Sequence, residues 1–201
     1  MSPFLPCFII FLIILTYFLR KNTRLEQETQ EQFWEKERLA NAARKKNIKD
    51  LPYLTIPLET FPLGKYSDSE LSRLEQELSK LAETSILNLN GITNTDLKLH
   101  YGLANLDFLS ECDENYTEMI RLLQDYGKRL FELSHQNDAE TVLRYAVDSG
   151  SDICATYTLL ADIYLAENAV AKLSSLIETA KNLNSARKDT ILEKLNSKHP
   201  A

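Results

Sequence analysis

The chain has 201 residues, of which 44% are hydrophobic and 26% are charged, which suits one compact domain with short attachments. Only 5 glycines and 6 prolines are present, and this scarcity disfavours β-sandwiches, barrels and glycine-rich nucleotide loops, so we expect an all-α protein. Residues 1–19 carry no charged side chain, residues 20–50 carry a net charge of +3, and residues 51–201 carry −9, a balance that disfavours nucleic acid as a partner.

The first predicted element is an apolar segment at residues 4–19, FLPCFIIFLIILTYFL. At about 1.5 Å per residue, a helix over residues 1–19 is roughly 28 Å long, close to the thickness of a hydrocarbon core of about 30 Å. No basic residue precedes the segment and bulky residues fill its end, so a membrane anchor over residues 1–21 is favoured over a cleaved signal peptide. The lipid bilayer is therefore the first expected partner.

Residues at the end of this segment predict its orientation. Arg20, Lys21 and Arg24 follow it, and Tyr17 suits the membrane interface. Because positively charged flanks stay in the cytoplasm, we expect a single-pass protein of the cell membrane with its N-terminus outside and its remainder cytoplasmic. The three cysteines are widely spaced and form no CxxC pair, which agrees with a reducing compartment and disfavours a zinc site.

Two attachments follow the anchor. Residues 22–50 are rich in good helix formers and predict a polar helical stalk, in which Phe33 and Trp34 are candidate docking residues. Residues 51–66 contain Pro52, Pro57 and Pro62, which exclude a regular helix, together with several large apolar side chains. We expect an extended strap packed on the helical domain, and the alternative is a built-in ligand lying in the groove of that domain.

Residues 67–201 predict a helical domain whose short connections make neighbouring helices antiparallel. The capping box Ser67-Asp68-Ser69-Glu70 opens its first helix, and the cap Thr93-Asn94-Thr95-Asp96 opens a second helix through Phe108. Further helices are expected at 113 to about 133, 137 to about 149 before Gly150, 152–167, 169–182 and 185 to about 194.

Seven apolar or small residues of this domain recur thirty-four positions later. They are Leu123, Tyr126, Gly127, Leu130, Ala139, Leu143 and Ala146, followed by Tyr157, Leu160, Ala161, Tyr164, Leu173, Ile177 and Ala180. In this order they resemble the tetratricopeptide repeat, with repeats at about 120–153 and 154–187. The resemblance implies stacked helical hairpins, and the layout as a whole is similar to small bacterial membrane-anchored helical-repeat proteins.

The same resemblance implies a partner-binding face, because ligands of tetratricopeptide repeats contact the first helix of each repeat. The matching positions here are Arg121, Gln124, Lys128, Phe131, Thr158, Asp162 and Leu165. Arg121 and Lys128 suit a carboxylate, whereas Phe131 and Leu165 offer apolar contact. The alternative is that these are ordinary surface residues.

No residue set predicts an active site. The histidines, His100, His135 and His199, have no metal-ligand spacing, and no phosphate loop or GxSxG turn is present, so we expect neither a metal nor a cofactor. Asp107 and Glu111 lie one helical turn apart, but a solvated helix end explains them better than acid–base catalysis. The sequence thus predicts a non-enzymatic membrane-anchored adaptor that binds an unidentified protein or peptide. The alternatives are a permanent structural subunit of a larger membrane complex and, more remotely, a membrane-bound hydrolase.

Overall fold

The computed structural model describes residues 30–198, which form helices, connecting loops and one isolated antiparallel bridge between Leu54 and Ile86. The all-α fold class is thereby confirmed for this part of the chain. The predicted anchor at residues 1–21, with Tyr17, Arg20, Lys21 and Arg24, lies outside the described residues. Within residues 30–198, no helix combines the length and the apolar character needed to cross a membrane.

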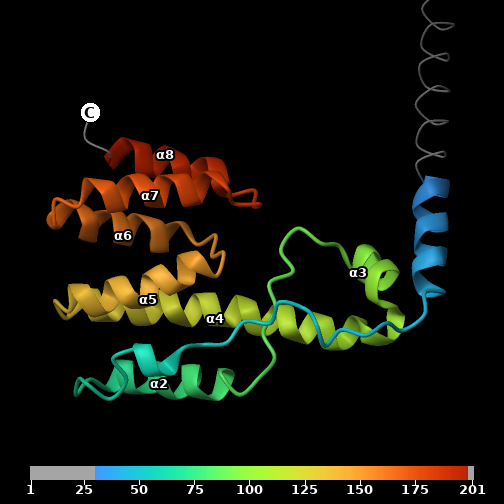
Figure 1. Cartoon of the computed structure of the whole chain (residues 1–201), viewed down its shortest axis with the longest axis horizontal. Helices are drawn as coiled ribbons and strands as arrows, with labels where there is room; N and C mark the ends of the chain where they lie inside the picture. Colours follow the sequence, from blue (N-terminus) through green and yellow to red (C-terminus); the bar gives the residue numbers. More distant parts are fainter. Residues whose placement is uncertain (1–29, 199–201) are drawn as a thin grey trace, which may run out of the picture. The chain divides into compact units, whose positions relative to one another are not determined.

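The described residues divide into two compact units, of which the smaller comprises residues 30–47 and 93–106 (Figure 1). It pairs a helix over residues 30–41 with α3 (Asn94–Tyr101), which the 3-10 turn η2 (Leu103–Asn105) follows. Lys98 donates a hydrogen bond of 2.7 Å to Glu37 across this pair. The stalk helix expected over residues 22–50 ends at residue 41, after which the chain turns and Lys46 N–H bonds the carbonyl of Tyr101.

The boundary between α3 and α4 (Leu106–Glu132) differs from the expected one. The sequence predicted one helix through Phe108 and another from Asp113, whereas the break lies at Gly102 and α4 runs unbroken over 27 residues. Gly102 has a φ of 88°, which glycine adopts easily, and the side chain of Asn105 donates to the carbonyl of Tyr101 at 2.7 Å. A left-handed glycine, and not the acidic run at 111–114, therefore separates the two helices.

The larger unit comprises residues 48–92 and 107–198. Besides most of α4, it contains the 3-10 turn η1 (Leu58–Thr60), α2 (Ser69–Leu81), α5 (Gln136–Asp148), α6 (Cys154–Ala166), α7 (Val170–Lys181) and α8 (Lys188–Lys198). Helices α5 to α8 stack one above another (Figure 1), and α6 packs against α5, α7 and α8. Because the turns are short, consecutive helices run in opposite directions.

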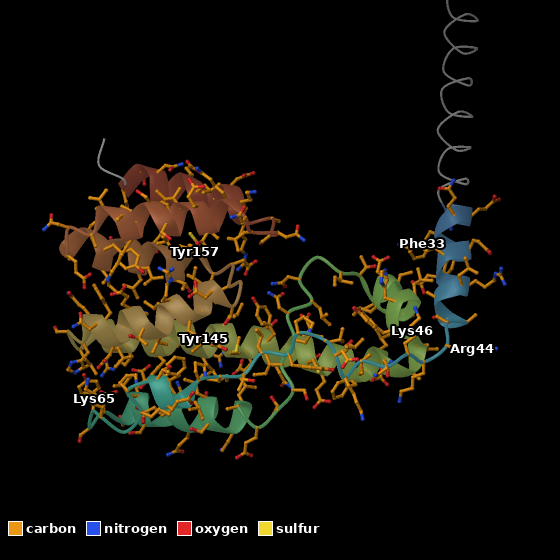
Figure 2. All side chains as sticks on the ribbon, in the orientation of Figure 1. Phe33, Arg44, Lys46, Lys65, Tyr145 and Tyr157 are labelled. Carbon is orange, nitrogen blue, oxygen red and sulfur yellow. The ribbon has the colours of Figure 1, made fainter. Side chains whose placement is uncertain are left out.

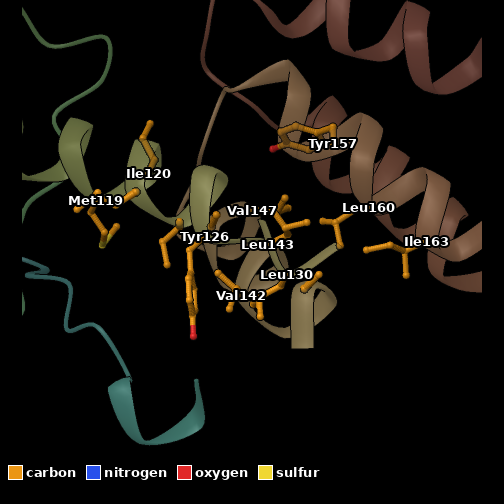
Figure 3. Packing of buried hydrophobic residues seen from close by; sticks show 14 of the residues in the cluster. Met119, Ile120, Tyr126, Leu130, Val142, Leu143, Val147, Tyr157, Leu160 and Ile163 are labelled. Carbon is orange, nitrogen blue, oxygen red and sulfur yellow. The ribbon is translucent and has the colours of Figure 1, made fainter. Parts of the chain in front are cut away.

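One continuous hydrophobic core holds this stack together (Figure 3). Tyr126 of α4 and Tyr157 of α6 are fully buried, as is Leu143 of α5. A Cβ atom built on Gly127 of α4 would lie only 2.5 Å from Leu143, so the missing side chain lets α4 and α5 approach closely. Burial of each large side chain in such a core contributes about 1.5–3 kcal/mol.

The turns inside the two hairpins, α4–α5 and α6–α7, have the same backbone conformation thirty-four residues apart. Ser134 has a φ of 65° in the first turn, and Asn168 has a φ of 55° in the second. The next N–H bonds to a carbonyl five residues earlier, at 2.9 Å for His135 and 2.8 Å for Ala169. Because non-glycine residues seldom adopt a positive φ, the two turns share an uncommon backbone conformation at matching positions.

The strap at residues 51–66 packs onto the larger unit mainly through Ile56 and Phe61, which are buried. Tyr145 of α5 (Figure 2) donates a hydrogen bond of 2.8 Å to the carbonyl of Thr55. Its ring also meets the ring of Phe61 edge-on, with centroids 5.7 Å apart. These contacts involve α5, the second helix of its hairpin.

Candidate partner-binding surface

The seven residues predicted to bind a partner lie on α4 and α6, the first helices of the two hairpins, but their exposure differs. Three are exposed, namely Arg121, Lys128 and Asp162. Thr158, Phe131 and Leu165 are half-buried, and the two apolar ones pack against the core. Gln124 is buried.

Gln124 links the two helices and does not belong to an accessible face. Its side chain is only 8% exposed, and its carbonyl oxygen accepts a hydrogen bond of 2.6 Å from the buried hydroxyl of Thr156 on α6. The bond satisfies both buried polar groups, which is the usual condition for placing them in a core. From its position in the repeat, Gln124 was predicted to be exposed. That position does not reveal that the hydroxyl of Thr156, on the next hairpin, reaches its side-chain amide.

Arg121 and Lys128 are exposed but already take part in ion pairs along α4. Arg121 donates to Glu118 at 2.5 Å and to Asp125 at 3.1 Å, and Lys128 lies 3.7 Å from Glu132. The hydrogen bond to Glu118 raises the pKa of Arg121 above its ordinary value. Exposed pairs of this kind contribute only about 0–1 kcal/mol, so a carboxylate of a partner can replace them at little cost.

On α6, the exposed Asp162 forms an ion pair with Lys198 of α8. Thr158 donates to the carbonyl of Ala155 in its own helix at 3.1 Å. The last helix therefore lies beside α6 and contributes a charged side chain to the surface that the sequence assigned to α4 and α6 alone.

A groove between α2 and α4, which sequence reasoning missed, lies next to Arg121. Its volume is about 280 Å³, and its lining consists of Glu77, Lys80, Leu81, Thr84, Glu118 and Leu122. Leu81 and Leu122 are both at least nine-tenths buried, and they form the apolar bottom of the groove. No sequence signal pairs α2 with α4, because the two helices are separated by α3 along the chain.

A second, polar hollow of about 450 Å³ lies where the strap meets the turn before α5. There the ring of Tyr66 stacks on His135 with centroids 3.6 Å apart, and both Lys65 (Figure 2) and Tyr66 donate to Asp138, at 2.8 and 2.5 Å. Burial raises the pKa of Asp138, but these two hydrogen bonds outweigh it and leave the pKa below its ordinary value. These bonds hold the end of the strap against α5, because Lys65 and Tyr66 belong to the strap and Asp138 belongs to α5.

The carboxylates considered for catalysis, Asp107 and Glu111, are both exposed on α4. His135 is engaged in the stacking described above, and His100 is exposed in the smaller unit. In the described part of the chain, no cluster of His, Cys, Asp and Glu side chains is arranged to hold a metal ion.

Comparisons with known proteins supply no relative from which a site or an activity can be transferred: no family model, no curated protein and no solved structure matches the chain.

Proposed function

We propose that this protein is a membrane-anchored adaptor whose tetratricopeptide-repeat-like helical domain binds another protein on the cytoplasmic side. The recurrence of the α4–α5 turn in α6–α7 carries this proposal. Arrays of equivalent hairpins present the first helix of each hairpin on one extended surface, which such proteins use for binding. The apolar segment at residues 4–19 with its basic border supports the anchor and the orientation.

Four of the seven face residues form the binding surface in this proposal: Arg121, Lys128, Thr158 and Asp162. The buried Gln124 is left out because it bonds Thr156, and Phe131 and Leu165 are left out because they pack against the core. The surface is non-catalytic in this proposal, and its charged side chains exchange their present ion pairs for pairs with the partner.

Site-specific photo-crosslinking in intact membranes tests the proposal. A photoreactive residue replaces Lys128 or Asp162 on the proposed surface, or Glu178 on α7 as the exposed control. If the protein is such an adaptor, positions 128 and 162 should each cross-link to the same single partner, and position 178 should give no adduct. The same adducts from all three positions, or none from any, would contradict the proposal.

Two further readouts separate the alternatives. Adducts that appear only in a stoichiometric complex surviving mild solubilisation and a salt wash favour a permanent subunit over an exchanging adaptor. Recovery of the full-length chain in a salt-washed supernatant would refute the anchor, and digestion of the helical domain by protease added outside sealed cells would refute the orientation.

A further inference from the structure

The groove between α2 and α4 continues into an open row of carboxylates along α4. Glu118 stands on the α4 wall of the groove. Three further acidic residues precede it at spacings of four, three and four positions, which places all of them on one side of the helix. They are Glu114, Glu111 and Asp107.

Within the described part of the chain, the acidic row of Asp107, Glu111 and Glu114 is uncovered and unneutralised. All three side chains are exposed, and none forms an ion pair with a cation of residues 30–198. By contrast, both carboxylates that line the groove have partners on their own helices: Glu77 pairs with Arg73 and Glu118 with Arg121. Because α2 ends at Leu81 beside the groove, the row extends past the end of α2.

An exposed aromatic side chain borders the row. Phe108 is 41% exposed and lies one turn before Glu111 on α4. At the other end, the floor of Leu81 and Leu122 offers a second apolar contact. Apolar contacts at both ends of a negatively charged row match an amphipathic cationic segment better than a free cation.

We propose that the groove and the acidic row together bind a helical, Lys/Arg-rich segment of another protein, with one apolar side chain of that segment seated between Leu81 and Leu122. Three neighbouring carboxylates that form no ion pair within residues 30–198, in a domain of net charge −9, attract a cationic partner and repel an acidic one.

This inference rests on the proposed function and names the class of partner. The cytoplasmic flanks of membrane-spanning helices are rich in Lys and Arg. An adaptor tethered to the same membrane encounters such flanks in neighbouring membrane proteins. The acidic row is thus complementary to the cationic border of a neighbouring membrane-spanning helix.

The test uses the full-length protein in nanodiscs of neutral phosphatidylcholine. The probe is a short fluorescein-labelled helical peptide with Lys on one face and a single Leu on the other, and its Kd is measured by anisotropy at physiological ionic strength. The variant Asp107→Asn/Glu111→Gln/Glu114→Gln removes the row, and we expect its Kd to rise about tenfold.

A matched control variant, Asp50→Asn/Glu59→Gln/Glu193→Gln, removes the same charge from exposed carboxylates outside α4 and should change Kd less than about twofold. Equal weakening in both variants would overturn the proposal, because net charge alone would then explain binding. Failure of the wild-type protein to bind the peptide would also overturn it.

The groove is tested separately by Thr84→Trp, which fills it at an exposed rim position without changing charge. We expect weaker binding of the Leu-containing peptide and no change for a peptide with Gly in place of that Leu. Failure of the wild-type protein to bind the peptide, with cross-links still formed at positions 128 and 162, would refute only this inference. Peptide binding by the wild-type protein without cross-links at positions 128 and 162 would refute the proposed surface but not the acidic row as a binding site.

Discussion

Asp68 and Arg129 join the start of α2 to α4 through a single carboxylate. One oxygen of Asp68 accepts from the backbone N–H of Leu71 at 2.9 Å and caps α2, and the other accepts from Arg129 at 2.6 Å. The hydrogen bond from Arg129, followed by that from Leu71, lowers the pKa of Asp68 to about 2. The capping box of the sequence pointed instead to Ser67, one residue earlier, as the cap.

This depressed pKa predicts an acid-dependent loss of stability. Asp68 stabilises the fold when it is ionised, so its contribution is present above its ordinary pKa of 3.8 and is lost as the pH falls from there towards 2. Denaturant unfolding between pH 6 and pH 2 should therefore show a smaller loss of stability for Asp68→Asn than for the wild-type protein. Identical pH profiles for the two proteins would contradict this assignment.

The cap itself is tested at neutral pH by comparing Asp68→Ala with Ser67→Ala. Asp68→Ala removes the cap together with the bond to Arg129, so it should lower Tm by at least about 2–4 °C, the size expected for one helix cap in a chain of this length. Ser67→Ala should leave Tm unchanged, since Ser67 makes no capping bond. A larger effect of Ser67→Ala would mean that the sequence pattern identifies the cap correctly.

The sequence predicted the helical class well because that feature depends on local periodicity. Leu71, Leu74, Leu78 and Leu81 repeat at helical spacing, and all four are buried. What it missed depends on contacts between distant residues. The burial of Gln124 depends on its bond to Thr156. The groove depends on contact between α2 and α4, which are not consecutive in the sequence. The left-handed Gly102 was missed as a break because helix formers surround it.

The buried bond between Gln124 and Thr156 predicts a strongly non-additive pair of substitutions. Thr156→Val leaves the amide of Gln124 without its partner, and such a loss typically costs about 1–3 kcal/mol. Adding Gln124→Leu replaces both polar groups and should recover much of that cost. Urea unfolding of the wild type, both single variants and the double variant measures the coupling, and additive effects would show that the bond is not formed in solution.

The strap should be an integral part of the larger unit. Phe61 is 6% exposed and meets Tyr145 edge-on, so Phe61→Ala should cost about 3–5 kcal/mol and increase hydrogen exchange at residues 51–66. The matched control is Phe33→Ala, because Phe33 is 53% exposed in the smaller unit and its loss should cost less than about 0.5 kcal/mol. Unchanged exchange in Phe61→Ala would show that the strap does not depend on this contact.

Gly127 tests how tightly the first hairpin is closed. Alanine favours a helix over glycine by about 1 kcal/mol, yet its Cβ would lie 2.5 Å from the side chain of the buried Leu143, so that this side chain or one of the two helices must shift. Since overpacking a core costs about 1–3 kcal/mol, we expect Gly127→Ala to destabilise the protein despite the gain in propensity. Combining it with Leu143→Val should cost less than the sum of the two single changes, because the smaller side chain makes room. Denaturant midpoints of the three variants decide the matter: a stabilising Gly127→Ala would mean that propensity outweighs the close approach of α4 and α5.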